Sequence, residues 1–467
     1  MSRRWAGFAA AVACSCLALT ACTTDTDPVS QGDAEPTASR APAPVRTTPA
    51  PPEEEPVVLV VHATDPRSSM TLDAAHAALR GRLSSLQVVA AQGMPVGPDV
   101  PELAQEKVLR QVERAPGTLG VVPLSALRPT VKRLLVGGID PLRQPGRYPV
   151  TVAGTAPGHP VTLTVVGDVM LARGVTDPAG ALAPMGDRLR SADITVGNLE
   201  STLSTAGPPQ QGGDSFGGGP ELLQLLRRAG FDALSLANNH TGDFGDQALV
   251  ETVRLLEGAG LRPFGAGRDL LQAGRPAVVE VDGTTFGFLG FNAIGETPMA
   301  AVGIPGAFSV RMPPRTGPLN RADLRFLLDH VRVLNGRVDV VVVLPHWGTQ
   351  YTHTPEEVQR LVSRRLVDAG ADLVVGGHPH WVQGLDVHRG VVVAHSLGNF
   401  VFDMDFMTET QQGVVLEATY WNDELKAVDL VPYRIDAAFA PRPASPDEAR
   451  EILADVWSTS TGPFSAG

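Results

Sequence analysis

The fold is decided by VTLTVVGDVML at residues 161–171, an apolar run that stops at Asp168. A run without alternation of apolar and polar residues indicates a strand covered on both faces, as in a sheet packed between other layers. Such runs alternate along the chain with amphipathic stretches typical of helices. The sequence predicts a mixed-sheet α/β domain over 161–433, with strands at 161–167, 194–197, 233–237, 277–281, 286–291, 338–344, 373–375 and 391–394 and helices at 221–229, 247–259, 323–334 and 355–369.

A tight turn is predicted at Asp282-Gly283, between the runs at 277–281 and 286–291. Aspartate followed by glycine favours the two-residue turn of a β-hairpin, because both positions need a positive φ. These two strands are therefore expected to be antiparallel neighbours, which makes the sheet mixed rather than wholly parallel.

Polar side chains that can bind metals follow five of the predicted strands. In an α/β sheet, ligands bind where several loops converge at the carboxyl ends of the strands. Side chains at five such ends would form a single site. The residues are Asp168, Glu200, Asn239, His240, His346, His378 and His380.

This set of side chains suits a divalent metal. Carboxylate, amide and imidazole groups together favour Mn, Fe or Zn, and a glutamate such as Glu200 could bridge two ions about 3.5 to 4 Å apart. His240, beside a candidate ligand, could instead supply a proton to a leaving group. We therefore expect one or two divalent metal ions, bound by Asp168, Glu200, Asn239 and three histidines.

Each of these residues also has a structural explanation when it is taken alone. Asp168 can form a turn or cap a helix, Asn239 suits a turn, and His346 beside Trp347 can be a buried core histidine. The loop GGHPH at 376–380 is harder to explain in this way. Two histidines two residues apart in a Gly/Pro loop converge naturally on a metal.

The motifs around these residues resemble the CapA-type poly-gamma-glutamate capsule biosynthesis protein family. They occur in the order of that family, from 161 to 414. The motifs are GDVML at 167–171 with Arg173, NLE at 198–200, LANNH at 236–240, GAG at 265–267, HWG at 346–348, GADLVVGGHPH at 370–380 with Gln383, and SLGNFVFD at 396–403.

That family is similar to the calcineurin-like metallophosphoesterases, so the resemblance implies a mixed β-sandwich flanked by helices, with a two-metal site. It implies that Asp168 and His380 bind the first metal. Asn239, His346 and His378 would bind the second, and His240 would be the general acid. The motif residues Arg173, Asn198 and Asn399 are then candidates for substrate binding.

Two positions depart from the phosphoesterase pattern. Met170 stands where those enzymes have a second histidine, although the CapA type shares this difference, and Gly197-Asn198 stands where they have a bridging aspartate. A thioether binds hard divalent ions poorly, and a neutral amide does not bridge as a carboxylate does. Either Glu200 bridges, or the first metal is weak or absent.

The N-terminus reads as a lipoprotein signal peptide over residues 1–22. Arg3 and Arg4 precede an apolar run, and LTAC at 19–22 resembles a bacterial lipobox that would make Cys22 a lipid-modified residue. The alternatives are an ordinary secretory signal or an uncleaved anchor, and the export route stays open. We expect an extracytoplasmic protein that is lipid-anchored to the bacterial cell membrane.

Three further segments flank the main domain. Residues 23–56 are rich in Pro, Ala and Thr with almost no large apolar side chain, which predicts a disordered tether. Residues 57–150 predict a small α/β domain that faintly resembles a lobe of a periplasmic substrate-binding protein. Residues 434–467 form a C-terminal extension with a short helix at 446–457, expected to pack peripherally.

The charge of the chain disfavours nucleic acids as partners. The formal net charge is -12, and no stripe of Lys or Arg offsets it locally. The partners expected instead are the membrane through the lipid anchor, an anionic envelope polymer or lipid-linked ligand, and a capsule synthesis complex. A polyanionic ligand would need metals or Arg173 to compensate the negative charge.

Two functions stay open from the sequence alone. The first is a metal-dependent hydrolase, phosphoesterase-like, that acts on a phosphoester or on an amide bond of an envelope polymer. The second is a non-catalytic assembly factor that holds polymer or lipid-linked ligand in the same cleft. The candidate ligands and His240 favour the first, whereas the departures at Met170 and Asn198 favour the second.

Overall fold

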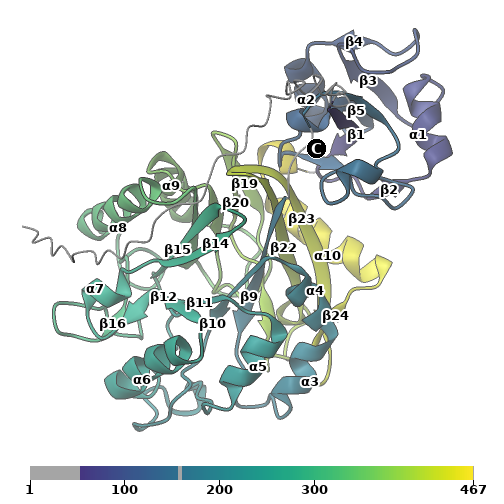
Figure 1. The fold of residues 1–467 in the computed structure, drawn as a ribbon. Helices are drawn as coiled ribbons and strands as arrows, with labels where there is room; N and C mark the ends of the chain where they lie inside the picture. The colour runs from purple at the N-terminus through teal and green to yellow at the C-terminus, as the bar shows by residue number, and fades with distance from the viewer. Residues whose placement is uncertain (1–52, 156–159, 466–467) are drawn as a thin grey trace, which may run out of the picture. The chain divides into compact units, whose positions relative to one another are not determined.

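The structure is a computed structural model that describes residues 53–155 and 160–465 (Figure 1). The predicted signal peptide with Cys22 lies outside these residues, as does the predicted tether up to residue 52. The predicted end of the tether at 56 falls inside the first strand, β1 (Glu54–His62). Among the described residues, no helix is long and apolar enough to cross a membrane.

The small N-terminal domain is α/β, as predicted, and is built on a mixed sheet. The strand order is β4-β3-β5-β1-β6, with β8 also paired to β1. β1 runs antiparallel to β5, whereas β3 runs parallel to β5. Its elements are β2 (Ser69–Met70), α1 (Leu72–Leu79), β3 (Gln87–Ala91), β4 (Glu102–Leu103), α2 (Gln105–Arg114), β5 (Thr118–Pro123), β6 (Val131–Arg133), β7 (Leu135–Val136) and β8 (Thr151–Ala153).

The first sheet of the large domain has eight strands and a parallel half. β9 pairs in parallel with β10, which leads through β11 to β12. On its other side β9 pairs antiparallel with β22, followed by β23 and β24. The strands are β9 (Val161–Val169), β10 (Ile194–Leu199), β11 (Ala233–Ser235), β12 (Arg262–Phe264), β21 (Asn399–Val401), β22 (Gln412–Trp421), β23 (Glu424–Ile435) and β24 (Pro441–Pro443).

The second sheet has six strands in the order β14-β15-β17-β18-β20-β19. The predicted hairpin is confirmed, since β14 and β15 are antiparallel and Asp282 and Gly283 both have positive φ. β15, β17, β18 and β20 are parallel to one another. The strands are β14 (Ala277–Val281), β15 (Thr284–Asn292), β17 (Val340–His346), β18 (Leu373–Val375), β19 (Leu385–His388) and β20 (Val391–Ala394).

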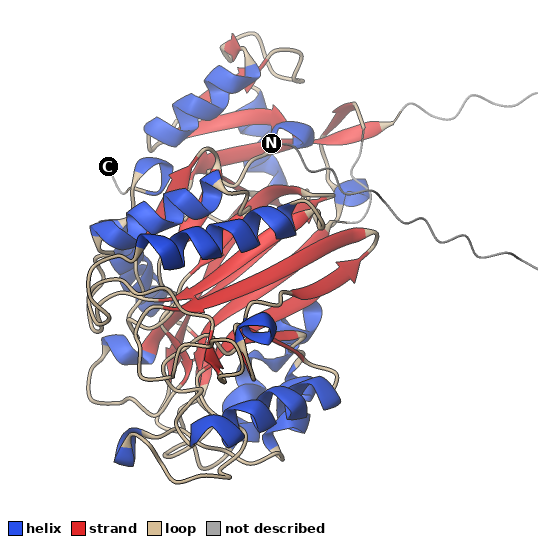
Figure 2. Cartoon of the chain, turned by 90° about the vertical axis from the view of Figure 1, so that its left-hand side faces the viewer, coloured by secondary structure: helices blue, strands red, loops and turns tan. Residues whose placement is uncertain are grey.

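The two sheets stack face to face with helices outside them, which confirms the predicted flanked β-sandwich (Figure 2). Val165 and Val196 of the first sheet share a buried cluster with Phe286 and Val342 of the second. The opposite face of the first sheet packs on α5 (Leu222–Ala229) and α6 (Gly245–Gly258). That of the second sheet packs on α8 (Arg321–Asn335) and α9 (Glu357–Asp368).

The C-terminal segment belongs to the core of the large domain. The predicted helix is present as α10 (Pro446–Thr459), but Ile452 and Val456 are fully buried in the cluster between the sheets. The expectation that this segment packs peripherally is therefore wrong. The sequence does not predict the long β22–β23 hairpin, because polar residues interrupt both strands and neither forms the continuous apolar run that marks the parallel strands.

Candidate functional site

The strand ends that carry the predicted polar residues meet at one edge of the sandwich. Asp168 lies in β9 beside Asn198 of β10. Glu200 follows β10 directly, His346 ends β17, and the loop with His378 and His380 follows β18. Both sheets therefore contribute side chains to the same buried place, which is where parallel strands of an α/β fold place their ligands.

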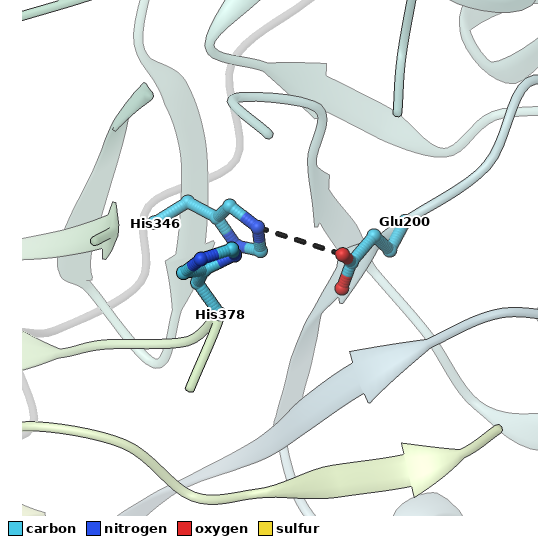
Figure 3. Close-up of side chains that lie close together, drawn as sticks. All are labelled: Glu200, His346 and His378. Atoms are coloured by element: carbon cyan, nitrogen blue, oxygen red, sulfur yellow. Dashed lines mark ion pairs between the residues drawn. The ribbon is translucent and has the colours of Figure 1, made fainter. Parts of the chain in front are cut away.

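Five of these side chains form two overlapping groups that could each hold a metal ion, with Glu200 in both. One group is Glu200, His346 and His378 (Figure 3), and the other adds Asp168 and His380 to Glu200. Within each group the ligand atoms lie within 4.8 Å of one another. A carboxylate shared by two groups is the arrangement that a bridged pair of ions requires.

Orphaned polar atoms show that the residues fit a metal ion. Both ring nitrogens of His378 and the Oε1 atom of Glu200 are buried without any hydrogen-bond partner. Such atoms cost free energy when they stay unpaired, so each one calls for a ligand that the protein itself does not supply. A divalent cation would satisfy them, and the mixture of imidazole and carboxylate donors suits Mn, Fe or Zn.

Burial shifts the pKa values of the site's titratable side chains so that few of them carry a positive charge. Burial lowers the pKa of His346 to about 4 and that of His380 to about 3, so both imidazoles are neutral and offer a lone pair. Burial, together with the charge of Glu200, raises the pKa of Asp168 to about 7. Burial, together with the charges of Asp243 and Glu296, raises the pKa of Glu200 to about 8. Positive charge is what the site lacks.

Asn239 faces this cluster with its amide oxygen. Its Oδ1 lies 2.8 Å from Nε2 of His346. Its Nδ2 donates a hydrogen bond of 2.8 Å to Glu296, a residue that the motifs did not indicate. Asn239 is thus placed where the sequence predicts a ligand, with the oxygen on the inner side.

Asn198 lies inside the cluster rather than on a surface open to substrate. Its Nδ2 donates to Oδ1 of Asp168 at 2.8 Å and lies 3.2 Å from Nδ1 of His346. Its Oδ1 accepts from Asn238 at 2.9 Å. With its oxygen engaged, Asn198 presents only N–H groups to the site, so it orients two candidate ligands and does not replace the bridging aspartate.

Met170, the other position that departs from the phosphoesterase pattern, is fully buried in the hydrophobic core. Its sulfur accepts a hydrogen bond from the backbone of Ala172 at 3.2 Å. The carboxylates and His380 are the donors on this side of the cluster.

His240 has the contacts of an oriented proton donor. Its Nδ1 lies 2.8 Å from Oδ2 of Asp243, and its Nε2 lies 3.9 Å from Oε1 of Glu200. Its ring stacks on Phe216 with centroids 3.6 Å apart. Asp243 and Phe216 were missed from the sequence, although Asp243, three residues after His240, carried a local signal.

Arg173 lies at the rim of the site, on the other face of Phe216. Its guanidinium carbon is 4.2 Å from the Phe216 ring centroid. Its side chain pairs with Asp403 and more loosely with Asp214, at 3.6 Å. Arg173 is partly exposed, which fits a contact to an anionic group from outside.

Asn399 is fully buried behind His380 and has both polar groups engaged. Its Oδ1 accepts from Nδ1 of His380 at 2.8 Å, and its Nδ2 donates to the carbonyl of Thr410 at 3.0 Å. The structure therefore places it as a residue that orients His380. It does not reach the surface where a substrate would bind.

The GGHPH loop follows β18 closely because its first two residues have no side chain. A Cβ atom on Gly376 would lie 2.2 Å from the carbonyl oxygen of His395, and one on Gly377 would lie 2.6 Å from Oδ1 of Asp168. His378 and His380 both have positive φ, at 97° and 59°. Backbone strain of this kind is concentrated at functional sites.

Comparisons with known proteins agree with the motifs. The capsule biosynthesis protein CapA of Bacillus anthracis is 29% identical over 296 residues, which are 61% of this chain and 70% of that protein. The PGA biosynthesis protein CapA of Bacillus subtilis strain 168 is 29% identical over 304 residues, which are 62% of this chain and 76% of that protein.

A solved structure, the 5'-nucleotidase of Candida albicans SC5314, is 12% identical, covering 63% of this chain and 57% of that one, with a TM-score of 0.35. At that TM-score the likeness carries no weight for fold or activity. The family described as bacterial capsule synthesis protein PGA_cap matches residues 162–404, more than half of the chain and the whole span of the site. The chain therefore belongs to the bacterial capsule synthesis protein PGA_cap family.

Proposed function

We propose that this protein acts in the synthesis or processing of a capsule or poly-gamma-glutamate-type envelope polymer, as a metal-dependent hydrolase. One observation carries the proposal: both ring nitrogens of His378 are buried without a hydrogen-bond partner. They lie beside Glu200, the residue that both candidate metal groups share. The residues that would hold the metal are Asp168, Glu200, Asn239, His346, His378 and His380.

The chain's own residues have separable roles in such a reaction. A divalent ion, when bound, supplies Lewis-acid activation of the substrate. Asp243 accepts the Nδ1–H of His240 and so leaves Nε2 directed at the cluster, where it can hold a proton and pass it to a leaving group. The Phe216 ring fixes the imidazole plane.

The rim of the site supports an anionic substrate. Arg173 is a basic group at this rim, and Tyr351 and the exposed Phe406 form an aromatic wall whose ring centroids lie 5.7 Å apart. A chain with a formal net charge of -12 repels polyanions at a distance. Bound metal together with Arg173 would reverse the sign of the potential at the site.

A second function is favoured by one observation. Asn198 directs N–H groups at Asp168 and His346, where a bridging carboxylate would strengthen a first metal. A weak first metal would suit an assembly factor that binds an anionic polymer or lipid-linked ligand without cleaving it. In that case the partner would be a capsule synthesis complex rather than a free substrate.

We also propose that the protein works outside the cytoplasm, lipid-anchored to the cell membrane through Cys22. LTAC at 19–22 supports the anchor, and the export signal before it supports the location. The names of the CapA relatives, which refer to capsule and PGA biosynthesis, agree with a role at the cell envelope.

The experiment combines metal stoichiometry with a screen of phosphoester and gamma-glutamyl substrates. Asn239→Ala, His346→Ala and His378→Ala should each lower the metal content, because each removes a proposed ligand. His240→Ala should keep the metal and lower turnover by roughly a hundredfold to ten-thousandfold. His330→Ala, a partly exposed histidine of α8, is the matched control and should change neither quantity.

The outcomes separate the two functions. A wild-type protein that binds no metal contradicts the proposed site. A protein that binds metal, turns over none of the substrates and yet loses polymer assembly in the ligand variants is the assembly factor. In that case His240→Ala should leave assembly intact.

A further inference from the structure

Asn239 is an amide, and only one end of an amide can bind a cation. The oxygen carries lone pairs, whereas the NH₂ group only donates hydrogen bonds. A 180° turn of the amide would aim the NH₂ group at the metal site. Something must therefore hold the amide of Asn239 with its oxygen inward.

Glu296 makes the contact that decides this orientation. Asn239 Nδ2 lies 2.8 Å from Oε2 of Glu296, and Asn239 Oδ1 lies 2.8 Å from His346 Nε2. An ionised carboxylate can only accept hydrogen bonds, so the group that faces Glu296 has to be the amide nitrogen. The oxygen is then directed at the cluster by elimination.

Glu296 is itself held in place from two sides. Its Oε1 pairs with Arg315, which reaches it from beyond the site. The loop that carries Glu296 is tied to the loop of Asn239, because Gly242 donates its backbone N–H to Oγ1 of Thr297 at 2.9 Å. The carboxylate therefore cannot turn away without breaking an ion pair.

The backbone at Glu296 is strained in a way that the surroundings must support. Its φ is 64°, in the left-handed region that residues other than glycine rarely adopt. Asn292, at the end of β15, braces the turn by donating to the carbonyl of Gly295 at 3.0 Å and accepting from the N–H of Ile294 at 2.9 Å. A strained residue that contacts a candidate ligand indicates a functional constraint.

We propose that Glu296, pinned by Arg315, is a positioning residue that keeps the amide oxygen of Asn239 directed at the metal. This inference rests on the proposed metal site and adds two residues outside its ligand set. Partners of this kind orient metal ligands, and their loss typically lowers metal affinity by about 10- to 100-fold. Arg315→Ala should have a smaller effect in the same direction, because its side chain is partly exposed.

The test is Mn²⁺ binding by isothermal titration calorimetry, with a thermal melt of each variant to show that it is folded. Glu296→Gln should weaken Mn²⁺ binding about 10- to 100-fold, because a glutamine amide can pair with either orientation of Asn239. Glu257→Gln is the matched control, since Glu257 is also a partly exposed glutamate paired with an arginine, Arg275, and should bind Mn²⁺ as the wild type does.

Loss of the negative charge of Glu296 alone could also weaken Mn²⁺ binding. Repeating the Glu296→Gln comparison in a protein that also carries Asn239→Asp distinguishes the two causes. Asn239→Asp places a symmetric carboxylate that needs no orienting partner and that Glu296 repels. In this background Glu296→Gln should leave Mn²⁺ affinity unchanged or increase it. A purely electrostatic effect would instead give the same loss in both backgrounds and would overturn the inference.

The failure of the inference is distinguishable from failure of the metal site. If the wild type binds Mn²⁺ and Glu296→Gln binds it equally well, Glu296 does not position Asn239, and the metal site stands. If the wild type binds no Mn²⁺, the proposed function fails and this inference fails with it.

Discussion

Asp243 and His240 form a buried pair in which Oδ2 of Asp243 lies 2.8 Å from Nδ1 of His240. The same carboxylate accepts the backbone N–H of Phe216 at 2.6 Å, and the Phe216 ring covers the imidazole. A carboxylate accepts hydrogen bonds only, so the proton of a neutral His240 sits on Nδ1. Nε2 is then free to face Glu200 and the space where a substrate would react.

Asp243→Asn should change the tautomer of His240 without removing metal. The asparagine amide can donate to Nδ1, so the neutral ring would carry its proton on Nε2. The ring would then have no carboxylate to accept the Nδ1 proton while Nε2 carries the proton that the proposed reaction transfers. Turnover should fall by roughly a hundredfold to ten-thousandfold, the range for loss of a general acid or base. Nitrogen NMR of the histidine side chains should report the tautomer, and calorimetry should show unchanged Mn²⁺ affinity.

The control for this pair is Asp246→Asn. Asp246 lies in the first turn of α6, only three residues further along, and has no hydrogen bond to His240. The Asp246→Asn variant should leave both the tautomer of His240 and turnover unchanged. Unaltered turnover in Asp243→Asn would show that the pair is structural.

The meeting of Asp168, Glu200, His346 and His378 could be predicted because each follows a strongly apolar run. Such runs become parallel strands, and the carboxyl ends of parallel strands share an edge. The fold class followed from the same runs. This part of the site depends on local sequence, which one chain displays directly.

The orienting residues could not be predicted in this way. Glu296 contacts Asn239 because a loop adopts positive φ at Gly295 and Glu296, and nothing in the local sequence distinguishes that glutamate from a solvated one. The motif predicts Asn399 as a substrate contact, yet tertiary packing places it behind His380. Roles that depend on packing between distant segments leave little trace in hydrophobic periodicity.

The same limit applies to α10. Its amphipathic pattern predicted a helix, but the pattern does not say which surface the apolar face meets. Ile452 and Val456 enter the cluster between the two sheets. Periodicity predicts the element, and the location of its buried face needs the fold.

Gly377→Ala should lower the free energy of Mn²⁺ binding by more than it lowers the free energy of unfolding. The added Cβ would lie 2.6 Å from Oδ1 of Asp168, too close for an unchanged structure, so either the loop or the carboxylate must move. Affinity for Mn²⁺ should fall about 10-fold or more, in line with displaced ligands. Gly258→Ala is the control, because a Cβ on Gly258 at the end of α6 meets nothing within 4 Å.

The Gly377→Ala comparison is read by titration calorimetry alongside thermal melts. Equal Mn²⁺ affinity in the Gly377→Ala and Gly258→Ala variants would show that the approach of the loop to Asp168 does not matter for metal binding. A melt that shows an unfolded variant at room temperature would show that this glycine serves the fold instead.

Cys22→Ala should release the protein from the membrane fraction or stall its processing. The prediction rests on LTAC at 19–22, which precedes a Pro-rich stretch. Two or more acyl chains anchor a protein far more firmly than one does, so their loss should be visible by simple fractionation. Cys16→Ala, in the apolar run before the lipobox, is the control. Unchanged membrane association and mass in Cys22→Ala would contradict the anchor.

The metal-free protein should become less stable as the pH rises from about 6.5 to 8. Burial raises the pKa of Asp168 to about 7 and that of Glu200 to about 8, whereas both acids ionise near pH 4 in an unfolded chain. Between these limits the folded state holds more protons than the unfolded state, so the free energy of unfolding falls with rising pH.

The window starts near pH 6.5 because the histidines act in the opposite direction below it. Burial lowers the pKa of His346 and His380, so below about pH 6.5 these two histidines bind protons only in the unfolded state and offset the effect of the two acids. Urea melts in EDTA at several pH values should show the fall above that point. Asp168→Asn should reduce its slope, since an amide does not ionise, and added Mn²⁺ should abolish it because the cation favours the ionised carboxylates. A metal-free protein whose stability stays level or rises between pH 6.5 and 8 would show that the two acids are already ionised in the folded state.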